Sequence, residues 1–128
     1  MRTHFIFYVA DQTKSTAFYS SVLEIEPHLM VPGMTEFALG NDAVLGLMPL
    51  SSASRLLGQE LLSSGEPRAE IYLMVDAPNN FHARALAAGA REISPYLARD
   101  WGHSAAYSID KDGNVIAFAC LTPDGITG

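Results

Sequence analysis

The chain has 128 residues, which is enough for one domain with a hydrophobic core that needs no disulfide or metal. With 48% hydrophobic and 17% charged residues, the composition excludes a disordered chain. The single cysteine excludes an intramolecular disulfide, and the formal net charge of −6 disfavours binding to nucleic acid or to anionic membranes. Because there is no signal-peptide pattern and no apolar run of membrane-spanning length, we expect a cytoplasmic protein.

The first part of the chain predicts a strand, a helix and three more strands. Aromatic and β-branched residues at His4–Val9 indicate a strand, and Lys14–Leu23 has helical spacing. Asp11 or Thr13 could cap this helix at its N-terminus. Three further strands are expected at residues 26–31, 35–39 and 43–48.

A different pattern fills residues 50–68. Four leucines with helical spacing predict an apolar stripe on a connector helix: Leu56, Leu57, Leu61 and Leu62. This helix would pack on the core; alternatively it would form a lid over a binding site, since long connections are often functional.

The second part repeats the order of the first. We expect a strand at 71–75, a helix at 80–88 that Gly89 stops, and strands at 92–96, 103–109 and 115–121. Two half-length copies of one strand–helix–strands unit are the simplest account of the chain. The predicted organisation is therefore a module at 1–49, a connector at 50–67, a module at 68–122 and a tail at 123–128.

Alternation along the strands divides the side chains between two faces. Phe5, Phe7 and Val9 are expected to face the first helix, with His4, Ile6 and Tyr8 on the opposite face. Ile71, Leu73 and Val75 are expected to face the second helix, with Glu70, Tyr72 and Met74 opposite. If the two faces away from the helices look toward each other, they enclose an apolar cleft suited to a small molecule.

The chain resembles the vicinal oxygen chelate superfamily, which includes glyoxalases, extradiol dioxygenases, fosfomycin-modifying enzymes and bleomycin-resistance proteins. The resemblance rests on the order and spacing of His4–Asp11, Phe18, Tyr19, Leu23, Glu70–Asp76, Ala88–Ala90, Arg99–Gly102 and Asp110–Asn114. It implies an α+β fold of two pseudo-symmetric βαβββ modules around a U-shaped cleft, usually in dimers.

In the metal-dependent members of that superfamily, ligands come from the first and last strands of each module. The resemblance places these positions at His4, Gly46, Glu70 and Ala117. His4 and Glu70 could bind a divalent metal, but glycine and alanine cannot, and a catalytic metal needs three protein ligands. His103 is a candidate third ligand. Alanine at position 117, where glyoxalases usually have a carboxylate, argues against glyoxalase chemistry and against extradiol cleavage.

A different set of residues is suited to holding a small molecule. We expect the ligand-binding residues to be Tyr8, Met48, Tyr72, Trp101 and Tyr107. Trp101 lies between Asp100 and Gly102 in a predicted turn, a poor position for a fully buried indole. The remaining histidines, His28 and His82, are expected to face solvent.

Three functions remain open from the sequence. The first is a metal-free binding protein that holds a small, partly aromatic or cationic molecule, with no cofactor and no catalytic residues. The second is a lyase or dioxygenase that uses a divalent metal at His4 and Glu70. The third is a dimeric protein with a vestigial cleft. Exposed strand edges favour a two-fold homodimer in each case.

Overall fold

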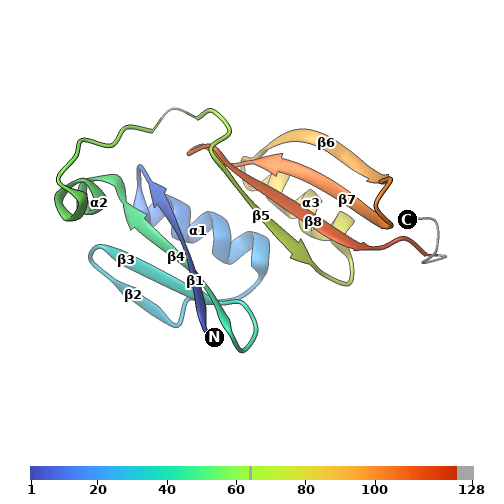
Figure 1. Cartoon of the computed structure of the whole chain (residues 1–128), viewed down its shortest axis with the longest axis horizontal. Coiled ribbons are helices and arrows are strands. Elements are labelled where there is room, and N and C mark those ends of the chain that lie inside the picture. Colours follow the sequence, from blue (N-terminus) through green and yellow to red (C-terminus); the bar gives the residue numbers. More distant parts are fainter. Residues whose placement is uncertain (64, 124–128) are drawn as a thin grey trace. The chain divides into compact units, whose positions relative to one another are not determined.

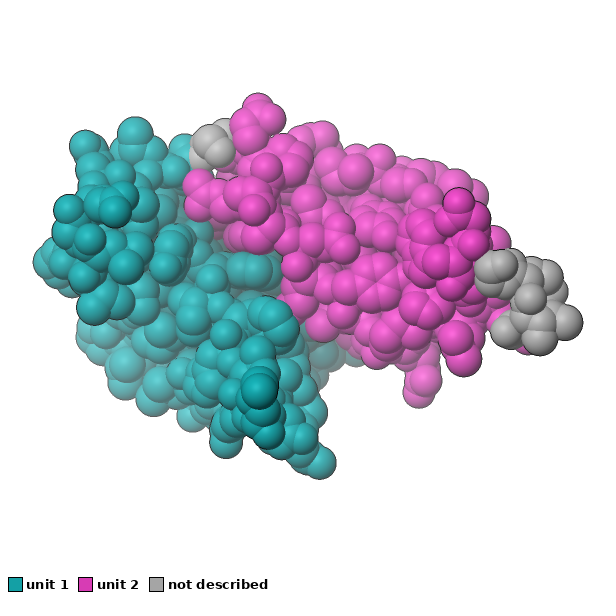
Figure 2. Space-filling view, in the orientation of Figure 1, with its two compact units in different colours: residues 1–64 teal, residues 65–128 magenta. Residues whose placement is uncertain are grey.

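Two compact units make up the chain, residues 1–64 and residues 65–128 (Figures 1 and 2). The computed structural model describes residues 1–63 and 65–123, so the predicted tail lies outside the described residues except for position 123. Each unit contains one four-stranded sheet that mixes parallel and antiparallel pairs. This element order confirms the α+β class and the two βαβββ modules.

Unit 1 contains the first four strands and two helices. The strands are β1 (Thr3–Val9), β2 (Leu29–Val31), β3 (Met34–Ala38) and β4 (Ala43–Pro49). The helices are α1 (Gln12–Leu23) and α2 (Leu50–Leu57). The strand order across the sheet is β1-β4-β3-β2, and β1 runs parallel to β4.

Helix α1 begins at a capped turn and packs on the sheet of unit 1. The Asp11 carboxylate accepts a hydrogen bond from the backbone N–H of Lys14 at 2.9 Å, which confirms the predicted cap. On the buried side of α1, the ring centroid of Tyr19 lies 6.0 Å from that of Phe7 in β1. Phe5 is 47% exposed, so the prediction that it packs under the helix is wrong.

Helix α2 is shorter than the connector helix predicted from the leucines. It ends at Leu57 because Gly58 adopts a left-handed conformation with φ of 69° and donates its N–H to the Ser54 carbonyl. The predicted apolar stripe is wrong: Leu56, Leu57 and Leu62 are exposed, and Leu61 and Leu62 come after the helix. Ala53 is the buried residue of α2.

Unit 2 contains the last four strands and one helix. The strands are β5 (Ala69–Met74), β6 (Arg91–Ala98), β7 (His103–Ile109) and β8 (Asn114–Leu121), and the helix is α3 (Pro78–Ala87). The strand order is β5-β8-β7-β6, with β5 parallel to β8. Among the described residues, no helix is long and apolar enough to cross a membrane.

Helix α3 covers one face of this sheet. Phe81 packs on Phe118 of β8 with ring centroids 5.5 Å apart. His82 is only 4% exposed, so the prediction that it faces solvent is wrong. It lies four residues after Pro78 and three before Ala85, which are the other buried residues of the helix.

The turn between β7 and β8 is held by one buried carboxylate. Asp110 Oδ1 accepts the backbone N–H groups of Asp112 and Asn114, each at 2.9 Å. Asp110 Oδ2 accepts from the side-chain amide of Asn114 at 3.0 Å. Gly113 supplies the positive φ of 91° that the turn requires. These bonds fix the start of β8, the central strand under the site described below.

Candidate functional site

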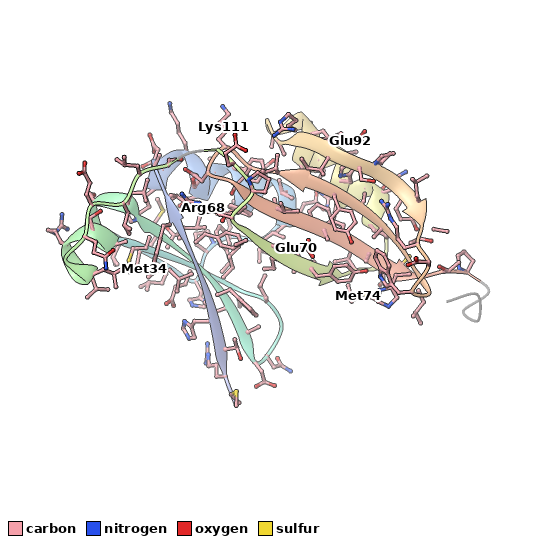
Figure 3. All side chains as sticks on the ribbon, turned by 45° about the horizontal axis from the view of Figure 1, so that its top comes forward. Met34, Arg68, Glu70, Met74, Glu92 and Lys111 are labelled. Atoms are coloured by element: carbon pink, nitrogen blue, oxygen red, sulfur yellow. The ribbon has the colours of Figure 1, made fainter. Side chains whose placement is uncertain are left out.

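The face of the unit 2 sheet away from α3 carries two tyrosines on either side of an alanine. Tyr72 on β5 and Tyr107 on β7 are both register partners of Ala117 on β8, so all three side chains lie on one face. Ala117 is fully buried, and both tyrosines are partly exposed. Figure 3 labels Glu70 and Met74, which precede and follow Tyr72 by two residues on β5 and so share this face.

A chain of hydrogen bonds links three ring side chains on this face. The indole Nε1–H of Trp101 donates to the Tyr72 hydroxyl oxygen at 3.0 Å. The same hydroxyl lies 2.8 Å from Nδ1 of His103. We call Tyr72, Trp101, His103 and Tyr107 the aromatic platform. Because the only polar atom of the indole is already bonded, the Trp101 ring is held in place while 49% of the residue stays exposed.

Small residues make the bond between Tyr72 and His103 possible. Along β8, Ala117 is level with Tyr72, and Leu121 is level with His103. The pair between these levels is Ala119 with Ala105, and both alanines are fully buried. Their methyl groups leave room for the Tyr72 side chain to reach along the sheet to the imidazole.

Arg99 fixes Tyr107 from the neighbouring strand end. Its Nε and Nη2 atoms donate to the carbonyl oxygen of Ala105 at 3.3 and 2.7 Å. Nη2 also donates to Ser94 Oγ at 3.0 Å and to the Pro95 carbonyl at 2.8 Å, across the irregular stretch of β6. The guanidinium carbon lies 5.2 Å from the centre of the Tyr107 ring, within cation–π range. Arg99 is therefore bound to the protein itself.

Glu70 brings a negative charge to the platform. Burial raises the pKa of Tyr107, and the carboxylate of Glu70 raises it further, while Arg99 lowers it. Tyr107 is thus a neutral phenol at neutral pH, and the Glu70 carboxylate lies close enough to act on it. The platform therefore consists of aromatic rings and an imidazole, and the Glu70 carboxylate acts on it through Tyr107.

A hollow of about 730 Å³ lies at the end of the unit 2 sheet where β5 and β8 end. It is lined by Met74, Val75, Asp76, Phe81, Cys120 and Leu121. Val75, Phe81 and Cys120 belong to the α3 side of the sheet, whereas Leu121, the register partner of His103, lies on the side of the platform. Met74 and Leu121 are 51% and 65% exposed, which gives this edge an apolar rim.

Unit 1 presents a different set of side chains on the face that carries Tyr8. Tyr8 and Met48 are register partners and lie side by side. On the same face, Glu36 is held between two histidines: His28 Nε2 lies 3.0 Å from one oxygen and His4 Nδ1 lies 3.6 Å from the other. These contacts give His4 a protein partner, and they show that His28 is paired as well as partly exposed.

The residues present do not fit a divalent metal at the positions that the resemblance implies. A Cβ atom on Gly46 would lie 2.5 Å from Ile6 Cδ1 and 3.2 Å from Met34 Sδ, so apolar side chains fill that position. Ala117 is buried and has no donor atom. Within residues 1–63 and 65–123, no group of three or more histidine, cysteine, aspartate or glutamate side chains could hold a metal ion.

The structure groups the predicted ligand-binding residues by unit. Tyr72, Trp101 and Tyr107 come together in unit 2, and Tyr8 and Met48 come together in unit 1. The cleft between the modules stays a prediction. His103, predicted only as a candidate metal ligand, lies four residues before Tyr107 on β7, and this spacing places both side chains on one face.

Comparison with known proteins agrees with this architecture. The family model of the Glyoxalase/Bleomycin resistance protein/Dioxygenase superfamily matches residues 2–118. The chain belongs to this superfamily. Members of the superfamily often bind small molecules and form dimers. Among curated proteins, no relative matches the chain.

Solved structures of other superfamily members share the fold at low sequence identity. A glyoxalase-related enzyme from Fulvimarina pelagi has a TM-score of 0.81 and 21% identity, covering 94% of this chain and 87% of that one. A glyoxalase/bleomycin resistance protein/dioxygenase family enzyme from Burkholderia phytofirmans has a TM-score of 0.79 and 21% identity, covering 93% and 97%. At this identity the likeness shows the fold alone.

Proposed function

We propose that the protein binds a small planar molecule, aromatic or cationic, on the aromatic platform and does so without a resident metal. The observation that carries this proposal is the Trp101 indole, which is half exposed yet held by its hydrogen bond to Tyr72. An exposed tryptophan with only a structural role would not need a hydrogen bond that fixes the orientation of its ring.

The restraint favours binding for a physical reason. Ordering a mobile side chain on association costs free energy, and a ring that is already ordered avoids most of that cost. Stacking on an aromatic ring, or placing a cation over it, is worth about 0.5–2 kcal/mol. The carboxylate of Glu70 near Tyr107 adds an attraction for positive groups.

Metal independence is supported by the donor set. The positions that would complete a metal site with His4 and Glu70 are a glycine covered by Ile6 and a buried alanine. His103 already faces the Tyr72 hydroxyl through Nδ1. No observation in the described part of the chain favours a metal-dependent lyase or dioxygenase.

The test is chemical-shift mapping of the ¹⁵N-labelled protein with three probes: indole, benzylamine and benzamide. We expect at least one probe to shift the backbone amides of residues 101–107 and 117–121, together with the indole N–H of Trp101, in a saturable manner. Leu56→Ala is the matched control, because Leu56 is an exposed apolar residue of α2 in unit 1. It should leave the shifts unchanged, whereas Trp101→Ala should reduce them. The proposal fails if no probe shifts these amides.

We also propose a two-fold homodimer. The outermost strands of the unit 1 sheet, β1 and β2, carry exposed apolar side chains that include Phe5, Ile6 and Met30. Edge strands of this kind are commonly covered by a partner. Light scattering should give twice the monomer mass at micromolar concentration, and a clean monomer mass would contradict the proposal.

A further inference from the structure

We propose that His103 selects ligands that carry an uncharged carbonyl oxygen on their planar ring. This inference rests on the proposed function, because it names the class of molecule that the aromatic platform takes. The observations that support it are the two hydrogen bonds of Tyr72 and the charges around the platform.

The chain of hydrogen bonds indicates which ring nitrogen of His103 carries the proton. Indole Nε1–H is a donor only, so Trp101 donates to the Tyr72 oxygen. The single hydroxyl proton of Tyr72 is then free to donate to Nδ1 of His103, 2.8 Å away. This arrangement pairs the phenol as donor with an imidazole nitrogen as acceptor, which is the favourable direction for these two groups. The alternative, with a proton on Nδ1, makes the Tyr72 oxygen accept from both the indole and the imidazole and leaves its own hydroxyl proton outside this bond.

The assignment fixes what His103 offers to a ligand. A neutral imidazole that accepts at Nδ1 carries its proton on Nε2, and its neighbour thereby sets the tautomer. The residue is partly exposed, and no protein partner of Nε2 is described. His103 therefore presents a hydrogen-bond donor at the apolar end of the platform, where Leu121 is its register partner. A ligand acceptor can take this hydrogen bond in place of water.

The charges favour a neutral acceptor over a carboxylate. Arg99, the cation beside Tyr107, uses its Nε and Nη2 atoms on protein oxygens. Arg91 is level with Val115 and Glu70, at the far end of the strands, about 20 Å along the sheet from the level of His103 at ~3.3 Å per residue. Glu70 itself is negative and acts on the platform through Tyr107. Glu70 and Arg99 act on Tyr107 with opposite signs, so the two charges offset each other there and an anionic ligand gains little that a neutral acceptor does not.

The first arm of the test measures the tautomer without any ligand. Long-range ¹H–¹⁵N correlation spectra of the histidine rings should show His103 protonated at Nε2 and unprotonated at Nδ1 at neutral pH. Tyr72→Phe removes the donor to Nδ1 and should give a mixture of tautomers. A proton on Nδ1 in the wild-type protein would overturn the inference, whatever the protein binds.

The second arm compares three probes that share one ring: benzamide, benzoate and benzylamine. We expect benzamide to bind about two- to tenfold more tightly than the other two, which is the range of one hydrogen bond. His103→Phe should abolish this preference, and His28→Phe, which alters a partly exposed histidine of unit 1, should retain it. If benzylamine or benzoate binds as tightly as benzamide, the inference is wrong while the proposed function stands. If no probe shifts the platform amides, the proposed function itself fails.

Discussion

Nε2 of His82 lies 2.9 Å from Oε2 of Glu92, and this bond ties helix α3 to strand β6. His82 is 4% exposed, whereas the Glu92 side chain reaches solvent with 44% of its surface. The helix that covers one face of the unit 2 sheet is thus bonded to the edge strand β6, and Arg99 bonds Ser94 and Pro95 in the middle of the same strand. Helix α3 packs on one face of this sheet, and the aromatic platform lies on the other.

Replacing His82 should destabilise the protein without changing the platform. His82→Ala removes a buried ring and its hydrogen bond, and we expect a loss of about 1–3 kcal/mol in the free energy of unfolding. Urea denaturation measures it. The control His28→Ala removes a partly exposed histidine that also pairs with a carboxylate, and it should cost less than about 1 kcal/mol. Equal losses in the two variants would contradict this account.

Enlarging Ala119 should separate Tyr72 from His103. Ala119→Leu places a branched side chain at the fully buried level between the two rings, so we expect a loss of about 1–3 kcal/mol in stability and weaker binding of benzamide. Ala106→Leu is the matched control, because this buried alanine of β7 lies on the α3 face. It should cost similar stability and leave the affinity for benzamide unchanged. Equal affinity losses in both variants would show that the site depends only on overall stability.

Gly46→Ala tests whether the Ile6 side chain occupies the space next to Gly46, one of the positions that the resemblance implies for a metal ligand. Gly46→Ala should destabilise the protein by at most about 1 kcal/mol, because the new methyl group meets only the terminal Cδ1 of Ile6 at 2.5 Å and this partly exposed side chain can turn away. Adding Ile6→Ala should recover part of that loss.

Elemental analysis of the purified wild-type protein should find no stoichiometric zinc, nickel, manganese or iron. One metal ion per chain that disappears in His4→Ala would overturn metal independence.

The sequence predicted the strands well because their residues are strongly patterned. His103–Ile109 was predicted with the bounds that the structure shows, and Asp11 was one of two predicted caps of the first helix, the other being Thr13. Helix α2 is shorter than predicted because Gly58, in a left-handed conformation, ends it before Leu61 and Leu62. His82 is buried instead of facing solvent because its spacing from Pro78 and Ala85 places it on the buried face of α3.

The site was predicted residue by residue, but its connections were not. Tyr72, Trp101 and Tyr107 follow from strand alternation and turn position. The bond from Trp101 to Tyr72 joins residues 29 positions apart, and the bond from Tyr72 to His103 joins residues 31 apart. Both depend on the register of β5, β8 and β7 and on the small side chains between them, and local sequence patterns do not encode that register.

The fluorescence of Trp101 tests the binding proposal most directly, because it is the only tryptophan in the chain. Titration with benzamide should change its emission saturably. In calorimetry, Trp101→Ala should weaken binding by about two- to 30-fold, the equivalent of 0.5–2 kcal/mol, while the urea midpoint stays the same. If a ligand whose binding is verified by calorimetry leaves the emission unchanged, and Trp101→Ala lowers stability rather than affinity, the aromatic platform is not the binding site.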